Sequence, residues 1–230
     1  MINTEQHRRA YLEALGIDVW VPREEPGEAA EPGTSATDAA APAPAAMDWD
    51  ALRAAVAGCR RCTLCETRTQ TVFGVGNRGA DWMIVGEAPG AEEDRRGEPF
   101  VGRAGKLLDE MLRAVGQGRD VAFIANILKC RPPNNRDPRP EESAACRGYL
   151  ERQIELVDPK IILAVGRIAA QLLLATDAPV GRLRGSVHRL GDIPLVVTYH
   201  PAYLLRSPGQ KRKAWDDLNL ARRTIRERAA

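Results

Sequence analysis

The chain has 230 residues, enough for one well-cored domain and additional material but too few to favour a second full domain. No run approaches the ~18 consecutive apolar residues of a membrane span, and the first residues lack the apolar centre and cleavage site of a signal peptide. The net charge of +2 conceals an asymmetry, since residues 1–50 hold 3 Lys or Arg against 10 Asp or Glu, and residues 51–230 hold 30 against 21. We expect a cytoplasmic protein with no membrane contact, whose basic body is compatible with attraction to nucleic-acid phosphates.

The first 47 residues divide into a short amphipathic peptide and a linker. Residues 5–23, EQHRRAYLEALGIDVWVPR, carry a cluster of apolar residues but are too few to fold alone. Residues 24–47 contain four prolines, many alanines and almost nothing that could fill a core, which is the composition of a disordered linker. We therefore expect three parts, namely an N-terminal peptide (1–23), the linker (24–47) and a folded domain (48–230).

From residue 48 onward, strand and helix patterns alternate. Short apolar runs rich in β-branched residues, each bounded by Gly, Pro or Asp, predict strands at 82–86, 121–128, 160–165 and 193–199. Helices are predicted at about 104–115, 141–157, 166–175 and 210–228. Strands separated by helices form parallel sheets that are covered on both faces. The expected fold is α/β, a three-layer α/β/α domain with a central parallel sheet of about four strands.

Polar groups follow several of these strands. Gly86 and Glu87 come after the first strand, Asn126 lies near the end of the second, and His200 follows the fourth. Sheets of this type bind ligands beyond the carboxyl ends of their strands, so an acid, an amide and an imidazole are expected on one rim. Each also has a structural explanation, because an acid before a turn and a hydrogen-bonded histidine are common in loops.

The five cysteines lie outside the N-terminal segment, at Cys59, Cys62, Cys65, Cys130 and Cys146. An odd number of cysteines in a chain without an export signal favours a metal or cluster site over disulfides. A C-x-x-C pair followed by two further cysteines suits either a [4Fe–4S] cluster or tetrahedral zinc, and the spacing does not separate them. We expect Cys65 to be a half-buried small apolar residue instead of a ligand.

Three separated runs resemble the family 4 uracil-DNA glycosylases, the iron–sulfur type. They are VGEAPGAEEDRRGEPFVGRAGKLLD (85–109), NILKCRPPNNRDP (126–138) and HPAYLLR (200–206). The resemblance extends from about Cys59 to about Trp215 and so covers the folded domain. GEAPG distinguishes this group from mismatch-type relatives, and we find no basic, histidine-bearing insertion after the second strand of the kind found in relatives that attach covalently to uracil sites.

The resemblance implies that the chain hydrolyses the N-glycosidic bond of deoxyuridine in DNA and thereby starts base excision repair. Glu87 would stabilise the cationic sugar and position water, and His200 would donate to uracil O2 as negative charge accumulates. The amide of Asn126 would read uracil against cytosine. The residues expected to surround the base are Gly86, Ala88, Glu93, Phe100 and Asn126, with Phe100 stacking on the base and Glu93 excluding the methyl group of thymine.

The same resemblance implies a cofactor and a DNA surface. It favours a [4Fe–4S] cluster, whose ligands would be Cys59, Cys62, Cys130 and Cys146. Bulky apolar residues would fill the gap left by the flipped base and a cation would grip phosphate, and these DNA-binding candidates are Tyr203, Leu204, Leu205 and Arg206. The basic run 211–213 could add phosphate contacts or could simply start a solvated helix.

Other functions remain open from the sequence. Residues 5–23 resemble the N-terminal peptide of the psi subunit of the bacterial DNA polymerase III clamp loader, which suggests a clamp-loader contact, although the peptide could equally dock on its own domain. The chain could then be a replication-associated subunit that uses the glycosylase fold as an interaction module. A zinc-dependent deaminase is disfavoured because no H-x-E accompanies a P-C-x-x-C pair. We expect the chain to act as a monomer on uracil-containing DNA.

Overall fold

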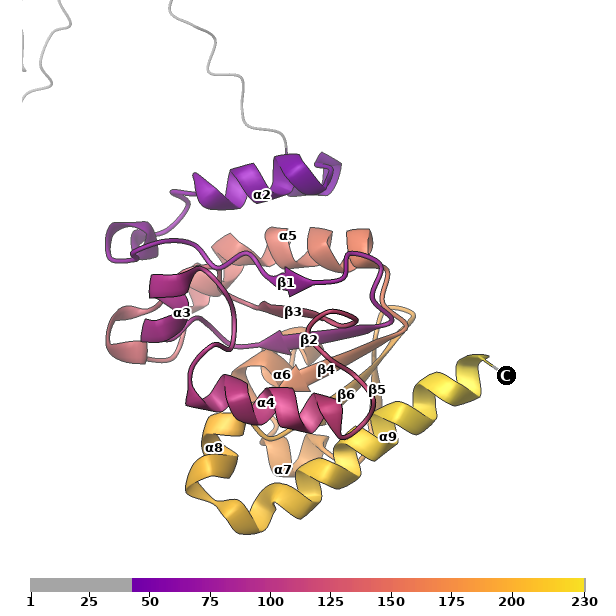
Figure 1. The fold of residues 1–230 in the computed structure, drawn as a ribbon. Coiled ribbons are helices and arrows are strands. Elements are labelled where there is room, and N and C mark those ends of the chain that lie inside the picture. The colour runs from indigo at the N-terminus through magenta and orange to yellow at the C-terminus, as the bar shows by residue number, and fades with distance from the viewer. Residues whose placement is uncertain (1–42, 230) are drawn as a thin grey trace, which may run out of the picture. The chain divides into compact units, whose positions relative to one another are not determined.

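The structure, a computed structural model, describes residues 43–229. Its centre is a six-stranded sheet in the order β1-β3-β2-β4-β6-β5 (Figure 1). The strands are β1 (Val75–Gly76), β2 (Trp82–Gly86), β3 (Phe123–Asn126), β4 (Ile161–Val165), β5 (Val187–Leu190) and β6 (Ile193–Thr198). The four inner strands are parallel, and β1 and β5 pair antiparallel with β3 and β6 at the two edges. The predicted parallel sheet of about four strands is confirmed, with two short edge strands added.

Helices cover both faces of the sheet. They are α2 (Trp49–Ala57), α3 (Ala91–Arg96), α4 (Arg103–Arg113), α5 (Pro140–Val157), α6 (Arg167–Leu174), α7 (Val180–Leu183), α8 (Pro201–Arg206) and α9 (Lys211–Ala229). Short 3-10 turns are η1 (Pro44–Ala46), η2 (Thr63–Glu66), η3 (Pro133–Asn135) and η4 (Pro208–Gln210). The four predicted helices are confirmed as α4, α5, α6 and α9, with ends that differ by a few residues.

The strand pleat divides the core into two clusters. In β2, Met83 and Val85 face a cluster that includes side chains of α5 and α6. Trp82 and Ile84 face the opposite cluster, with side chains of α4, α8 and α9. Every residue of β2 is buried, as expected for a parallel strand covered on both faces. This arrangement places the carboxyl ends of β2, β3, β4 and β6 at one edge of the molecule, where the expected site residues lie.

The folded part of the chain begins before residue 48. The N-terminal peptide and the linker up to residue 42 lie outside the described residues. The end of the expected linker is structured, since Pro44–Ala46 form a 3-10 turn and Met47 is 6% exposed. The guanidinium of Arg152 in α5 donates from Nε to the Met47 carbonyl at 2.6 Å, which fixes this segment against the domain.

The helices that the structure describes include none that combines the length and the apolar character needed to cross a membrane.

Candidate functional site

Gly86 and Asn126 end neighbouring strands and lie side by side. The parallel register of β2 and β3 pairs the two residues directly, and Asn126 is 2% exposed. A Cβ atom at position 86 would lie 2.4 Å from Asn126 Oδ1 and 2.5 Å from Phe100 Cζ. Only glycine therefore permits the amide of Asn126 and the ring of Phe100 to meet over the end of β2. The geometry brings together three of the residues predicted to surround a base.

The imidazole of His200 lies near the Phe100 ring. The two ring centroids are 5.7 Å apart with an interplanar angle of 30°. His200 is also the N-cap of α8, where its Nδ1 accepts a hydrogen bond from the Ala202 N–H at 3.1 Å. In a neutral imidazole, an accepting Nδ1 leaves the proton on Nε2. The cap therefore fixes the tautomer in which Nε2 is a donor.

The surroundings of His200 keep the ring neutral. Burial, with a further contribution from the charge of Arg206, lowers the pKa of His200 to about 4, although Glu93 acts in the opposite direction. At neutral pH the ring can donate one proton from Nε2 without carrying a positive charge of its own. The exposed Arg206 lies near enough for its charge to lower the pKa of His200, which puts this cation beside the site.

Glu87 directly follows β2 and is half-buried. Its carbonyl accepts from the Leu128 N–H at 3.0 Å, so its backbone is held against the segment after β3. Burial raises the pKa of Glu87, the charge of Asp137 adds to this effect and the charge of Arg167 opposes it, and together they bring the pKa to about 7. Asp137 and Arg167 form an ion pair at 2.5 Å. The sequence did not single out these two charged residues, because they lie far apart along the chain and meet only after folding.

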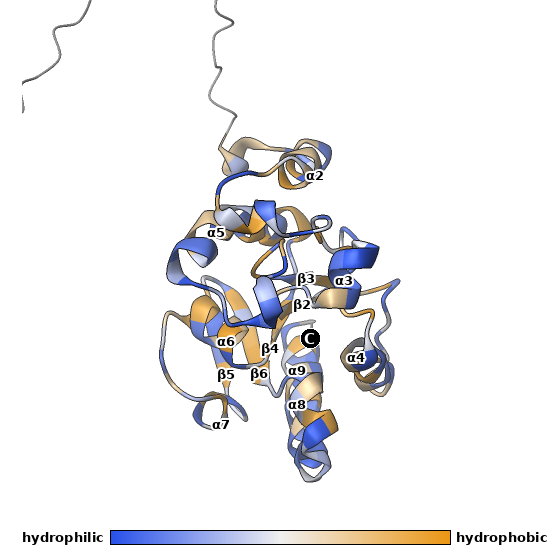
Figure 2. Ribbon diagram, turned by 90° about the vertical axis from the view of Figure 1, so that its left-hand side faces the viewer, coloured by the Kyte–Doolittle hydropathy of each residue, from blue (hydrophilic) through white to orange (hydrophobic). Residues whose placement is uncertain are grey.

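Glu93 lies in α3, and its carboxylate accepts two backbone hydrogen bonds. Its Oε1 accepts from the N–H groups of Val101 and Gly102 at 2.9 and 3.0 Å. Gly102 is the N-cap of α4, so this carboxylate sits where the helix leaves N–H groups without internal partners. Glu93 thereby fixes the segment that immediately follows Phe100. Figure 2 looks onto this end of the sheet, where the hydrophilic helix α3 lies beside the ends of the central strands.

The residues after His200 divide between the surface and the core. Tyr203 and Leu205 are 36% and 38% exposed. Leu204 is 1% exposed and belongs to the core cluster beneath α4, α8 and α9, so its expected DNA contact is wrong. The reason is helical geometry, since successive residues of α8 point in different directions and one of the three must face the domain. Ala88 is half-buried and packs against the other core cluster.

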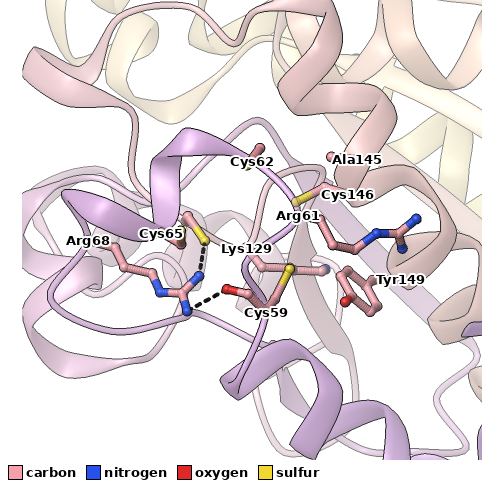
Figure 3. Close-up of a pocket in the computed structure, with 10 residues that line it drawn as sticks. Cys59, Arg61, Cys62, Cys65, Arg68, Lys129, Ala145, Cys146 and Tyr149 are labelled. Carbon is pink, nitrogen blue, oxygen red and sulfur yellow. Dashed lines mark hydrogen bonds between the residues drawn. The ribbon is translucent and has the colours of Figure 1, made fainter. Parts of the chain in front are cut away.

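All five cysteines line one pocket on the α5 side of the domain (Figure 3). Cys59 and Cys62 come from the segment between α2 and η2, Cys130 follows β3, and Cys146 lies in α5. Cys130 and Cys146 are buried, and the others, including Cys65, are half-buried as expected for that residue. Three segments distant in sequence thus direct thiols at a common volume.

One arginine fastens this cysteine pocket. Arg68 donates from Nη1 to Cys130 Sγ at 3.0 Å and from Nη2 to the Cys59 carbonyl at 2.8 Å. In the described part of the chain, no three cysteine, histidine or acidic side chains converge closely enough to hold a single metal ion. A [4Fe–4S] cluster needs thiolates that surround a common volume, because each one binds a different iron, and a pocket lined by cysteines fits that requirement.

Comparison with known proteins gives consistent matches. The family model described as the uracil DNA glycosylase superfamily matches residues 73–219. A type-4 uracil-DNA glycosylase of Archaeoglobus fulgidus is 46% identical over 161 residues, which are 66% of this chain and 81% of the relative. A type-4 uracil-DNA glycosylase of Thermotoga maritima is 42% identical over 173 residues, or 74% of this chain and 90% of the relative. A type-5 uracil-DNA glycosylase of Thermus thermophilus is 34% identical over 119 residues, which are 45% of this chain and 54% of the relative.

Proposed function

The chain belongs to the uracil DNA glycosylase superfamily and is a uracil-DNA glycosylase of the type-4 kind, and we propose that the strand-end site performs its excision of uracil. The observation that carries this assignment is the contact of an amide, an aromatic ring and an imidazole around Gly86, at the edge where parallel sheets bind ligands. A flipped base requires a pocket with these groups, since it is held by stacking and by hydrogen bonds to its edge.

Phe100 and Asn126 would recognise the base. The ring of Phe100 supplies a face for stacking, and the buried amide of Asn126 can donate to uracil O4 and accept from N3–H. Cytosine has a donor and an acceptor in the reversed positions, so the same amide orientation leaves both groups unpaired. Asn126 would therefore distinguish uracil from the normal base by hydrogen bonding alone.

His200 would stabilise the leaving group. When the C1′–N1 bond breaks, the electron pair stays on uracil and negative charge develops on its O2. The Nε2–H of His200 can donate to that oxygen, and the Nδ1 contact with Ala202 prevents the other tautomer from forming. Removal of one donor that is aimed at developing charge typically lowers the rate roughly 10²–10³-fold.

Glu87 would act on the sugar and the water. Its ionised carboxylate can stabilise the positive charge that develops at C1′ and can orient a water molecule toward that carbon. The water oxygen forms the new bond to C1′, one water proton is released, and the uracil anion leaves. The ionised form is the one that this role needs.

Glu93 remains our candidate for excluding thymine. Its carboxylate is held by the N–H groups of Val101 and Gly102, beside the segment that carries Phe100. A fixed carboxylate at the edge of the base would leave no room for a 5-methyl group and would repel an apolar substituent.

The exposed residues of α8 would engage the duplex. Tyr203 and Leu205 present apolar surface next to His200, where a side chain could fill the gap left by the flipped base. Arg206 and the exposed basic run 211–213 at the start of α9 offer cations for phosphates.

The cysteine pocket would hold a [4Fe–4S] cluster, with Cys59, Cys62, Cys130 and Cys146 as ligands. When bound, the cluster would cross-link the η2 segment, the segment after β3 and α5, which fastens the chain between Asn126 and α5. Tetrahedral zinc, which the cysteine spacing alone also allows, would need the thiols to converge on one ion, and those of the described residues do not.

An assay of base selectivity tests the proposed function. Purified protein is incubated with oligonucleotides that contain one uracil, or thymine or cytosine at the same position, and abasic sites are then cleaved with alkali. We expect cleavage at uracil alone, with matched oligonucleotides as internal controls. Cleavage at none of the three, or equal cleavage at uracil and thymine, would contradict the assignment of the pocket.

A further inference from the structure

Phe100 has a backbone conformation that its side chain does not favour. Its φ is 55°, in the left-handed region that bulky residues rarely adopt. Such conformations persist only where the surrounding structure enforces them, and they concentrate at functional sites. The ring reaches Gly86 and His200 from this conformation, so whatever holds the backbone also aims the ring.

Arg119 holds that backbone from a distant loop. It lies between α4 and β3, and its Nη1 donates to the Pro99 carbonyl at 2.9 Å while its Nη2 donates to the Phe100 carbonyl. Its Nε donates to Asp109 Oδ1 in α4 at 2.7 Å, and both side chains of this ion pair are about two-thirds covered. The planar guanidinium fork can make these three contacts together, which a lysine ammonium on a flexible stem cannot reproduce.

Helix α4 packs against the same carbonyl. A Cβ atom at Gly105 would lie only 1.6 Å from the Phe100 oxygen. The first turn of α4 thus packs directly on the peptide that Arg119 binds, and any larger residue there would displace it. The Phe100 carbonyl is therefore held both by the packing of a glycine of α4 and by the guanidinium.

We propose that Arg119 is a positioning residue that keeps the Phe100 ring in place to stack on the flipped base. The inference rests on the proposed function, since it requires that Phe100 stacks. Arg119 itself touches no base. Without its guanidinium, the carbonyls of Pro99 and Phe100 lose their donors, φ of Phe100 relaxes toward negative values, and the ring moves away from Gly86 and His200.

The first test compares Arg119→Lys and Arg119→Met with the wild type in single-turnover excision of uracil. We expect kcat/KM to fall roughly tenfold in both variants, because base–aromatic stacking is an effect of this order. Affinity for DNA with a stable abasic site should change less than twofold, since such DNA has no base to stack. Arg113→Met is the matched control, because Arg113 forms an exposed ion pair with Glu110 on α4 and should leave both values unchanged.

A double-mutant cycle with Phe100→Ala separates the positioning role of Arg119 from the stacking role of Phe100. If Arg119 acts through the ring, Arg119→Met should cost less than twofold in the Phe100→Ala background. The proposal is overturned if Arg119→Met costs the same factor in both backgrounds, or if abasic-site affinity falls in parallel with excision. If Phe100→Ala alone has no effect on excision, the stacking role fails, which is a distinct result. Should Arg119→Met fail to fold, Arg119→Lys carries the same cycle with the charge retained.

Discussion

At the scale of single residues, the ionisation of Glu87 should govern the pH profile. Its active form is the carboxylate, and its pKa is raised to about 7, chiefly by burial. Activity is therefore present above this pKa and is lost as pH falls through about 7. His200, with its pKa lowered to about 4, stays neutral across the window and adds no second limb. We expect kcat/KM, which reports free-enzyme pKa values, to show one acid limb near pH 7.

Two neighbouring substitutions should move that limb in opposite directions. Asp137→Asn removes a charge that raises the pKa of Glu87 and leaves the opposing charge of Arg167, so the limb should move to lower pH. Arg167→Gln does the reverse, and the limb should move to higher pH. Profiles of kcat/KM between pH 5 and 9 measure both shifts. Shifts of the same sign in the two variants would show that Glu87 does not set the limb.

Asn126→Asp should weaken discrimination against cytosine. A protonated carboxyl can donate to cytosine N3 and a carboxylate can accept from its N4 amine, so one of the two states of the new side chain suits cytosine at each pH. Excision of uracil and of cytosine from matched oligonucleotides, measured at several pH values, gives the ratio. Wild-type selectivity with full uracil activity would contradict the reading role of Asn126.

The residues that the sequence could predict are those whose position follows from strand ends. Glu87 follows β2, Asn126 ends β3 and His200 follows β6, and the parallel register alone brings such positions to one edge. Arg119 could not be found in this way, because its partners Pro99 and Phe100 lie on another loop and the contact exists only after α4 packs. Leu204 was misplaced because a sequence of three bulky residues does not show which one a short helix turns inward.

At the scale of elements, the cysteine segments make the iron content a sharp test. Anaerobically purified protein should be brown and absorb broadly near ~400 nm, with about four irons per chain. Cys130→Ala should reduce the iron content sharply, since Cys130 is a buried ligand candidate in the segment that follows Asn126. Cys65→Ala, a matched change in the same pocket, should leave it nearly unchanged. Colourless protein with one stoichiometric zinc would overturn the cluster.

The elements that the sequence predicted best are those buried on both sides. The inner strands are continuous apolar runs that only a covered parallel sheet explains, and β2 and β4 match their predicted positions within a residue. The edge strands were missed for physical reasons. β1 has only two residues, and β5 alternates between exposed and half-buried residues, which resembles an ordinary loop.

At the scale of the whole molecule, residues 5–23 are predicted to tether the enzyme to the replication machinery. They lie outside the described residues, so this rests on the sequence alone. Pull-down of the clamp-loader ATPase subunit should succeed with the full chain and fail with Trp20→Ala, because buried aromatic residues carry much of the energy of peptide binding. Excision from a short oligonucleotide should be the same in both proteins, and a loss of excision in Trp20→Ala would mean that the segment serves the catalytic domain.

The most direct test of the account is single-turnover release of free uracil from uracil-containing DNA by the wild type and by Glu87→Gln. The glutamine keeps the size of the side chain but removes the charge that the sugar cation requires. We expect the wild type to release one uracil per substrate site and leave abasic DNA, and we expect Glu87→Gln to be slower by roughly 10²–10³-fold at pH 8. No release of uracil by the wild type, or equal rates for the two proteins, would contradict the assignment of excision to the strand-end site.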